Sequence, residues 1–284
     1  MKVLVLGASG MLGNAMVRVL EKNSALEVYG SIRSKMGKIV FPGPLSSRIT
    51  SGIDVENASI LFEFLQHIHP EVVINCIGLV KQLKEVNDPI HAISINSLLP
   101  YLLARECANI GARLIHFSTD CVFSGKTGNY SERDEPDAQD LYGRSKLLGE
   151  VDYPHAVTLR TSIIGHELAS KHGLIEWFLS QEGKVKGYTR AMFSGLPTCE
   201  LARVVNEFVL PSPELRGVYH VGGASISKYD LLTIVDEIYA KGLKIIPDDH
   251  IKLDRSLDST RFSQLSGYVA PEWTELVTKM HDFQ

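Results

Sequence analysis

Apolar positions in the first half of the chain alternate between short continuous runs and runs with helical spacing. The run 2–6 (KVLVL) is apolar and rich in β-branched residues, which predicts a buried strand. After the glycine-rich stretch 7–13, apolar residues recur at helical spacing from Ala15 to Leu20 and predict a helix. Further strands are expected at 26–31, 49–53, 72–76, 113–117 and 156–159, and further helices at 55–67, 88–110 and 142–151. Strands that alternate with helices predict an α/β protein with a parallel sheet and helices on both faces.

Two polar or helix-breaking residues refine this pattern. Asp54 is a good N-cap for the helix at 55–67, and Pro100 is expected to kink or restart the long helix at 88–110.

Beyond Gly165 the alternation of strands and helices becomes less regular. The stretch 183–197 is rich in glycine and aromatic residues and is expected to be a binding loop. Helices are predicted at 200–210 and 231–239, a strand at 217–221 and an extended segment at 245–247.

These elements predict two parts of unequal size. Residues 1–165, rejoined by about 199–222, are expected to form a Rossmann-type doubly wound parallel sheet. Residues 166–198 and 223–284 are expected to form a smaller C-terminal substrate-binding lobe over the strand ends. Ligands in such sheets bind beyond the carboxyl ends of the strands.

Composition excludes several classes of protein. The chain has 284 residues, of which 44% are hydrophobic and 22% charged, as in ordinary globular proteins. Its net charge of −4 gives no basic surface for nucleic acid or an anionic membrane. No apolar run is long enough to span a bilayer, and the glycines that interrupt the apolar amino terminus argue against a signal peptide. The cysteines match no zinc or redox spacing, so we expect no metal site and reduced thiols in the cytoplasm.

The glycine pattern at 7–13 (GASGMLG) lies between the first predicted strand and helix. A glycine turn there lets backbone N–H groups approach a pyrophosphate at the helix N-terminus. Arg33 and Lys35 follow the second predicted strand, where an acidic residue would bind the ribose hydroxyls of NAD and an arginine accommodates a 2′-phosphate. The two cations therefore predict a preference for NADP(H), the alternative being solvated loop charges.

Tyr142 and Lys146 lie four residues apart on the helix predicted at 142–151. A tyrosine has an ordinary pKa of about 10, and a lysine ammonium one turn away would lower it. Thr119, at the end of the strand predicted at 113–117, can hold a substrate oxygen against the phenol. Such a pair alone is common on solvated helix faces. The glycine turn, Arg33 and Thr119 all follow parallel strands, so we expect them at one edge of the sheet. At this edge Thr119, Tyr142 and Lys146 can pass a proton to or from a carbonyl or alcohol.

The chain resembles the extended short-chain dehydrogenase/reductase superfamily, and more closely its dTDP-4-dehydrorhamnose reductase-like branch. The segments that carry the resemblance are GASGMLG at 7–13, STDCVFSG at 118–125, YGRSKLLGE at 142–150, LRTSIIG at 159–165 and, more weakly, RSLDSTRF at 255–262. The resemblance implies an NADPH-dependent reductase of the C4 ketone of a nucleotide-linked 4-keto-6-deoxy sugar, in the synthesis of polysaccharide or surface-glycan precursors. The implied partners are the nucleotide sugar and, in a homodimer, a second copy of the chain.

The resemblance also implies roles for particular residues. Tyr142 would protonate the sugar oxygen, Thr119 would bind the same oxygen, and Lys146 would bind the nicotinamide ribose and depress the Tyr142 pKa. With the glycine and strand-end patterns, the expected cofactor-binding residues are Gly7, Gly10, Met11, Leu12, Gly13, Arg33, Asp54, Val55, Cys76, Ile77 and Gly78. The expected substrate-binding residues are Thr119, Asp120, Cys121, Ile163 and Arg255.

Several other side chains admit a substrate role or a plain structural one. Arg160, Arg190 and Arg255 are candidates for the nucleotide diphosphate, with Arg255 preferred, because arginine binds phosphates bidentately. The remaining candidates, which can touch substrate or simply pack or lie at the surface, are His166, His172, Trp177, Phe178 and Phe193.

Cys121 departs from the resemblance, because the branch usually has a tyrosine there. The related GDP-fucose synthases carry a cysteine in a matching segment and use it as an acid/base in sugar epimerisation. An epimerase or a bifunctional epimerase/reductase is therefore one alternative function, while a half-buried packing role for Cys121 is the simpler reading. A second alternative is a non-catalytic, NADP-binding regulatory subunit, since the branch also resembles the regulatory subunit of a methionine adenosyltransferase.

Overall fold

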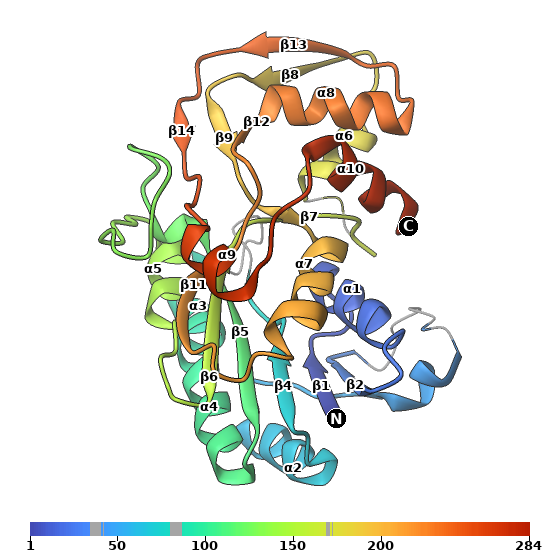
Figure 1. The fold of residues 1–284 in the computed structure, drawn as a ribbon, viewed down its shortest axis with the longest axis vertical. Helices are drawn as coiled ribbons and strands as arrows, with labels where there is room; N and C mark the ends of the chain where they lie inside the picture. The colour runs from blue at the N-terminus through green and yellow to red at the C-terminus, as the bar shows by residue number, and fades with distance from the viewer. Residues whose placement is uncertain (35–40, 42, 80–86, 169–170, 172) are drawn as a thin grey trace.

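The protein is built on one parallel sheet, as the computed structural model shows (Figure 1). The structure describes residues 1–34, 41, 43–79, 87–168, 171 and 173–284. Within them the sheet strands are β1 (Lys2–Leu6), β2 (Glu27–Ile32), β3 (Ile49–Ser51), β4 (Val72–Asn75), β5 (Arg113–Thr119), β6 (Ala156–Thr161) and β11 (Gly217–His220). Their order is β11-β6-β5-β4-β1-β2-β3, and every neighbouring pair is parallel. The expected α/β fold with a Rossmann-type doubly wound sheet is confirmed.

The central strand explains why the sequence of β1 is apolar throughout. Val3 and Val5 pack into the core on one face of the sheet, whereas Leu4 and Leu6 pack into the core on the other. All four side chains are fully buried. A parallel strand covered on both faces reads as a continuous hydrophobic run, because neither set of alternating side chains meets water.

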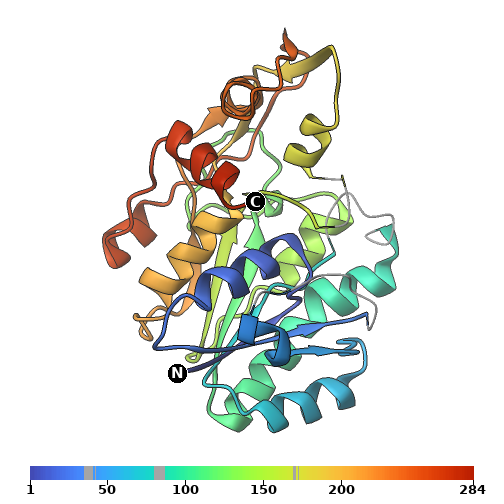
Figure 2. The same ribbon diagram turned by 90° about the vertical axis from the view of Figure 1, so that its right-hand side faces the viewer.

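Helices cover both faces of the sheet (Figure 2). On one face, Met16 of α1 (Met11–Leu20) and Leu201 of α7 (Thr198–Val204) share a core, and these two helices pack against each other. On the other face, Leu61 of α2 (Ala58–Ile68) and Leu103 of α4 (Leu99–Ile110) share the second core. The helix α5 (Leu141–Leu148) packs against β5.

Two predicted helices differ from the expectation in detail. The stretch expected to be one helix at 88–110 contains α3 (Pro89–Ala92), a π-helical segment η3 (Ile93–Leu98) and α4, with Pro100 in the first turn of α4. The helix expected from 55 begins only at Ala58, because the Asn57 side chain caps it. Asp54 instead accepts a hydrogen bond from Glu56 N at 3.1 Å in the preceding turn.

The expectation that 183–197 is a loop without regular structure is wrong. This stretch contains β8 (Lys184–Tyr188), β9 (Ala191–Phe193) and β10 (Leu196–Pro197). Their partners lie far away in sequence, so no local pattern reveals the pairing. The partners are β13 (Lys244–Asp248) for β8, both β12 (Ile226–Ser227) and β14 (Leu253–Asp254) for β9, and β7 (Ile163–Ile164) for β10.

The strand pairs formed by β8, β9 and their partners lie beyond the carboxyl ends of the parallel strands (Figure 1). Since β11 pairs with β6, residues 217–220 belong to the main sheet. Among the described residues, no helix has both the length and the apolar character needed to cross a membrane. The remaining helices are η1 (Gly43–Arg48), η4 (Asp120–Val122), α6 (Leu174–Leu179), η5 (Val205–Val209), α8 (Lys228–Tyr239), α9 (Thr260–Ser266) and α10 (Trp273–Asp282).

Candidate active site

The glycine turn connects β1 directly to α1. Gly7 has a φ of +81°, a conformation that side chains with a Cβ rarely adopt. Gly10 N donates to Gly7 O at 2.9 Å, which closes the turn. A Cβ placed on Gly13 would lie 2.1 Å from Gly7 O. Gly7 is therefore a glycine because of its backbone conformation, and Gly13 because the helix approaches the turn so closely.

Gly10 is a glycine for a different reason. It is the N-cap of α1 and provides no side-chain cap, and a Cβ placed on it would meet only Gly7 O, at 3.4 Å. The protein itself thus leaves space in front of the helix N-terminus, where N–H groups and the helix dipole favour an anion. Leu12 and Gly13 are buried in the first turn, while Met11 is half-buried. This arrangement fits the pyrophosphate of a dinucleotide.

The other expected cofactor residues follow the neighbouring strands. Arg33 is exposed just beyond β2, while Lys35 lies outside the described residues. Asp54 and Val55 follow β3, with Val55 buried. Cys76 follows β4 and donates its N–H to Leu6 O at 3.1 Å.

The segment after β4 leads from the cofactor residues towards the candidate catalytic residues. Burial raises the pKa of Cys76, so this thiol stays protonated. Ile77 N donates to Asn75 Oδ1 at 3.1 Å. A Cβ on Gly78 would lie 3.9 Å from Lys146 Nζ. Gly78 therefore lies close to the Lys146 side chain of α5.

Thr119 ends β5 and begins the short helix η4. It is buried, and its hydroxyl accepts a hydrogen bond from Cys121 N at 3.1 Å. The N-terminus of α5 lies against this turn, since a Cβ on Gly143 would be 2.3 Å from Cys121 O. Asp140 caps α5 by accepting from Gly143 N at 2.7 Å. This close approach places Tyr142 beside Thr119.

The pKa of Tyr142 is raised above its ordinary value. Burial is the main cause, and the nearby Cys121 and Asp120 add to it. A hydrogen bond with the Thr119 hydroxyl acts in the opposite direction. The expected depression of the Tyr142 pKa by Lys146 is therefore wrong: the net shift is upward. The phenol is held protonated, as a general acid must be before it acts.

Lys146 is buried one helical turn after Tyr142. Its ammonium donates to Phe117 O at 2.6 Å. Burial lowers the Lys146 pKa to about 8, although Glu150, just beyond the end of α5, raises it. The side chain therefore lies at the edge of β5 and can change charge near neutral pH.

The expected substrate residues gather around the same turn. Arg255 Nη1 lies 3.7 Å from Cys121 Sγ, and Arg255 Nε donates to Phe123 O at 2.7 Å. Burial raises the pKa of Asp120, while the charge of Arg255 lowers it. Ile163, half-buried, follows the end of β6. The structure thus joins Asp120, Cys121 and Arg255 near Tyr142.

Arg160 is not available for a diphosphate. It forms a buried bidentate ion pair with Glu150, with N–O distances of 2.7 and 2.6 Å, and its Nη1 lies 3.2 Å from His220 Nε2. Its position within β6, surrounded by the sheet, satisfies the guanidinium internally. This corrects the view of Arg160 as a substrate residue.

The aromatic and histidine candidates have mostly structural surroundings. Phe178 and Phe193 are buried in the core. His166 lies between Glu176 Oε1 at 2.7 Å and the Tyr239 hydroxyl at 2.8 Å. Arg190 and Trp177 are exposed, and His172 lies outside the described residues.

The sequence did not identify the polar residues that support this site. Asn96 Nδ2 donates to Ser145 Oγ and to Leu79 O, each at 3.2 Å, and so connects η3 with α5 and with the segment after β4. Ser118 Oγ donates to Glu150 Oε1 at 2.6 Å. Glu150 could have been identified from its position four residues after Lys146. Asn96 could have been identified as a polar residue at a position of the predicted helix that is expected to be buried.

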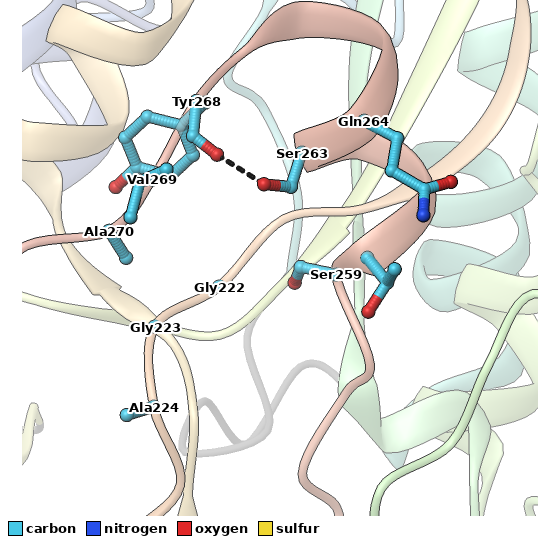
Figure 3. Close-up of a pocket in the computed structure, with 10 residues that line it drawn as sticks. Gly222, Gly223, Ala224, Ser259, Ser263, Gln264, Tyr268, Val269 and Ala270 are labelled. Atoms are coloured by element: carbon cyan, nitrogen blue, oxygen red, sulfur yellow. Dashed lines mark hydrogen bonds between the residues drawn. The ribbon is translucent and has the colours of Figure 1, made fainter.

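A separate pocket of about 340 Å³ lies between α9 and the segment after β11 (Figure 3). Figure 3 shows Ser263 Oγ donating to Tyr268 O, at 2.6 Å. Its lining residues are Gly222, Gly223, Ala224, Ser259, Thr260, Ser263, Gln264, Tyr268, Val269 and Ala270. These include none of Thr119, Tyr142 and Lys146, so the pocket is distinct from the candidate active site at the strand ends.

Comparison with known proteins identifies relatives in glycan synthesis. The chain is 35% identical over 169 residues to the probable low-salt glycan biosynthesis reductase Agl14 of Haloferax volcanii, a match covering 58% of this chain and 54% of that protein. It is 31% identical to the spore coat polysaccharide biosynthesis protein SpsK of Bacillus subtilis, over 83% of this chain and 78% of SpsK. It is also 25% identical to methionine adenosyltransferase 2 subunit beta of Xenopus tropicalis, over 88% of this chain and 74% of that subunit.

Solved structures share the fold over the whole chain. A dTDP-4-dehydrorhamnose reductase from Clostridium acetobutylicum has a TM-score of 0.81 at 22% identity, covering 100% of this chain and 99% of that one. A dTDP-4-dehydrorhamnose reductase from Bacillus anthracis, in complex with NADP, has a TM-score of 0.78 at 20% identity, with coverage of 100% and 99%. The model of the RmlD substrate binding domain family matches residues 1–282. The chain therefore belongs to the RmlD substrate binding domain family, within the extended short-chain dehydrogenase/reductases that its motifs predicted.

Proposed function

We propose that the protein is an NADPH-dependent reductase of the C4 ketone of a nucleotide-linked 4-keto-6-deoxy sugar, and that it serves the synthesis of a polysaccharide or surface glycan. One observation carries the proposal. Thr119 and Tyr142 lie together at the carboxyl edge of the sheet, where the Thr119 hydroxyl acts to lower the Tyr142 pKa, and Lys146 is held at the same edge by Phe117 O at 2.6 Å. This is a proton-transfer set next to a turn that fits a dinucleotide.

In the proposed reaction Tyr142 is the general acid. It would give its proton to the sugar oxygen as the ketone becomes an alcohol, while Thr119 binds the same oxygen. The ammonium of Lys146 would stabilise the tyrosinate that remains, since opposite charges favour each other strongly where water is excluded. NADPH, when bound, supplies the hydride.

The chain's own residues would hold the cofactor along the strand ends. The N-terminus of α1, with Gly10 at its cap, would bind the pyrophosphate, and Arg33 the 2′-phosphate. Asp54 and Val55 would flank the adenine, the segment 76–78 would line the cofactor, and Lys146 would bind the nicotinamide ribose. The solved relative in complex with NADP supports this choice of cofactor.

The substrate would lie between the strand ends and the lobe formed by 166–198 and 223–284. Asp120, Cys121, Ile163 and Arg255 would contact it. We propose that this lobe is a separate part from the sheet domain of 1–165 and 199–222. We also propose that the protein forms a homodimer. A nucleotide sugar carries a negatively charged diphosphate, to which the Arg255 guanidinium is suited.

The test is NADPH oxidation with a panel of dTDP-, UDP-, GDP- and CDP-linked 4-keto-6-deoxy sugars. We expect turnover with at least one of them. Tyr142→Phe should reduce kcat at least a hundredfold, because it removes the general acid, and should leave NADPH affinity nearly unchanged. Normal turnover by this variant would rule out the mechanism.

A bifunctional epimerase/reductase is the second candidate, because Arg255 lies beside the Cys121 thiol and a nearby cation favours a reactive thiolate. Running the same panel in D₂O distinguishes the two. Deuterium at C3 or C5 of the product that disappears in Cys121→Ser would establish epimerisation. A regulatory subunit, the third possibility, would reduce no sugar of the panel and would hold a stable protein partner.

A further inference from the structure

The phenol oxygen of Tyr130 collects three successive backbone N–H groups. Gly125 N, Lys126 N and Thr127 N lie 3.2, 3.0 and 3.3 Å from this oxygen. Backbone N–H groups that converge in this way form a small anion-binding concavity, here filled by a side chain of the same chain. Burial raises the Tyr130 pKa, but the hydrogen bonds lower it by more, so the net shift is downward. The hydroxyl therefore organises the turn at 125–127.

This turn, directly after the Thr119 to Cys121 segment, is joined to a distant part of the chain. Tyr130 N donates to Ser256 O at 2.8 Å and Asp258 N donates to Tyr130 O at 2.7 Å. Asp254 N donates to Gly125 O at 2.9 Å. The segments 123–130 and 254–258 are thus connected by backbone hydrogen bonds, although about 130 residues of sequence separate them.

Arg255 stands in the middle of this connection and has two contacts there. Its Nε donates to Phe123 O at 2.7 Å. Its stem lies against Gly125, where an added Cβ would be only 3.0 Å from Arg255 Cγ. Tyr130 holds both contacting residues, since its ring stacks on Phe123 at 4.2 Å and its hydroxyl accepts from Gly125 N.

We propose that Tyr130 is a positioning residue, which fixes the Arg255 guanidinium beside Cys121 and thereby sets the affinity for the nucleotide sugar. This rests on the proposed function for the identity of the ligand. Tyr130 is buried, so it would act on the substrate indirectly, through Phe123, Gly125 and Arg255. Its removal should therefore weaken binding of the sugar nucleotide without weakening binding of the dinucleotide at α1.

The experiment measures dTDP-rhamnose, UDP-glucose and GDP-mannose binding by calorimetry in the presence of NADP⁺. Tyr130→Phe keeps the stacked ring and removes only the oxygen. We expect it to weaken binding of the preferred probe about tenfold, as the loss of an organised charge-assisted contact would. Arg255→Ala should weaken binding at least as much, and the double variant should bind no more weakly than Arg255→Ala alone.

Further readouts distinguish positioning from general damage. Amide hydrogen exchange at 125–127 should accelerate in Tyr130→Phe and not in the control Tyr153→Phe. Tyr153 lies just before the amino-terminal end of β6, away from the carboxyl ends of the strands. NADP⁺ affinity should stay within about twofold of the wild type. Multiplying losses in the double variant, unchanged binding in Tyr130→Phe, or an equal loss of NADP⁺ affinity would each refute the positioning role.

Ketone reduction by the wild type separates this proposal from the proposed function. If the wild type reduces a sugar but Tyr130→Phe binds normally, only the role of Tyr130 fails. If the wild type binds none of the three probes, the positioning role of Tyr130 is also refuted. The reductase function is then judged by the NADPH oxidation panel alone.

Discussion

Lys146 determines the pH dependence that we expect of the reaction. Burial lowers its pKa to about 8, so the side chain is an ammonium below that pH and neutral above it. Because the ammonium stabilises the Tyr142 anion, kcat/KM should be level below pH 8 and fall by up to tenfold per pH unit above it. The profile of kcat/KM from pH 6 to 10 tests this.

Lys146→Met provides the matched variant, since it keeps the length of the side chain without the charge. Its kcat/KM should be at least about a hundredfold lower, and the decline above pH 8 should be absent. A decline of equal size in Lys146→Met would assign the ionisation to another group. Stability changes in the opposite direction to the charge of Lys146: the unfolded lysine holds its proton to higher pH, so stability should rise with pH from about 8 to 10.5.

Arg33 is expected to decide the choice between the two dinucleotides. A charge-assisted contact with the 2′-phosphate is worth about 1.5–3 kcal/mol, which corresponds to roughly ten- to a hundredfold in affinity. Arg33→Ala should raise the KM for NADPH by that factor and leave the KM for NADH unchanged. Arg216→Ala, an exposed arginine just before β11, is the control. Equal use of NADH and NADPH by the wild type would contradict the prediction.

Two glycines of the turn between β1 and α1 are expected to have different roles, Gly13 in folding and Gly10 in cofactor binding. Gly13→Ala should destabilise the protein, because its Cβ would lie 2.1 Å from Gly7 O and the backbone must move. Overpacking of this kind costs about 1–3 kcal/mol. Gly10→Ala meets only one atom at 3.4 Å and has allowed dihedral angles, so the free protein should keep its Tm.

The two variants differ in their response to cofactor. NADPH should raise the Tm of the wild type, because binding to the native state stabilises it. It should not raise the Tm of Gly10→Ala, whose methyl group occupies the space before the α1 N-terminus. A normal NADPH-induced shift in Gly10→Ala would show that the pyrophosphate binds elsewhere.

Single elements were predictable where one strand or helix carries its own signal. The run 2–6 and the glycine turn gave β1 and α1, since a doubly covered strand is apolar and a tight turn needs glycine. The stretch 183–197 gave no such signal. Its strands pair with β7, β12, β13 and β14, so their side-chain pattern depends on partners about 30 to 60 residues away.

A buried ion pair joins the parts of the molecule behind the site. Glu150, just beyond α5, pairs with Arg160 of β6, and Arg160 contacts His220 of β11. Both ion-pair side chains are less than a tenth exposed, at 7% and 6%. Glu150→Ala leaves Arg160 buried without its partner and should cost about 3–5 kcal/mol.

Urea denaturation measures this cost. Glu275→Ala is the control, because its pair with Lys279 is 58% exposed on the glutamate side and should contribute less than about 1 kcal/mol. Adding Arg160→Met to Glu150→Ala should recover part of the lost stability, since the unpaired charge is gone. A loss below 1 kcal/mol for Glu150→Ala would show that water reaches Arg160.

The sequence alone determined the doubly wound sheet and the place of the glycine turn. These follow from local rules: apolar periodicity defines the elements, and parallel strands bring their carboxyl ends to one edge. The grouping of Thr119 with Tyr142 and Lys146 was implied by the family resemblance. Only the tertiary structure decided the contacts between distant segments. It buried Arg160 against Glu150, raised the Tyr142 pKa and placed Arg255 beside Cys121. Burial and long-range pairing set these properties, and neither can be inferred from the residues that are adjacent in sequence.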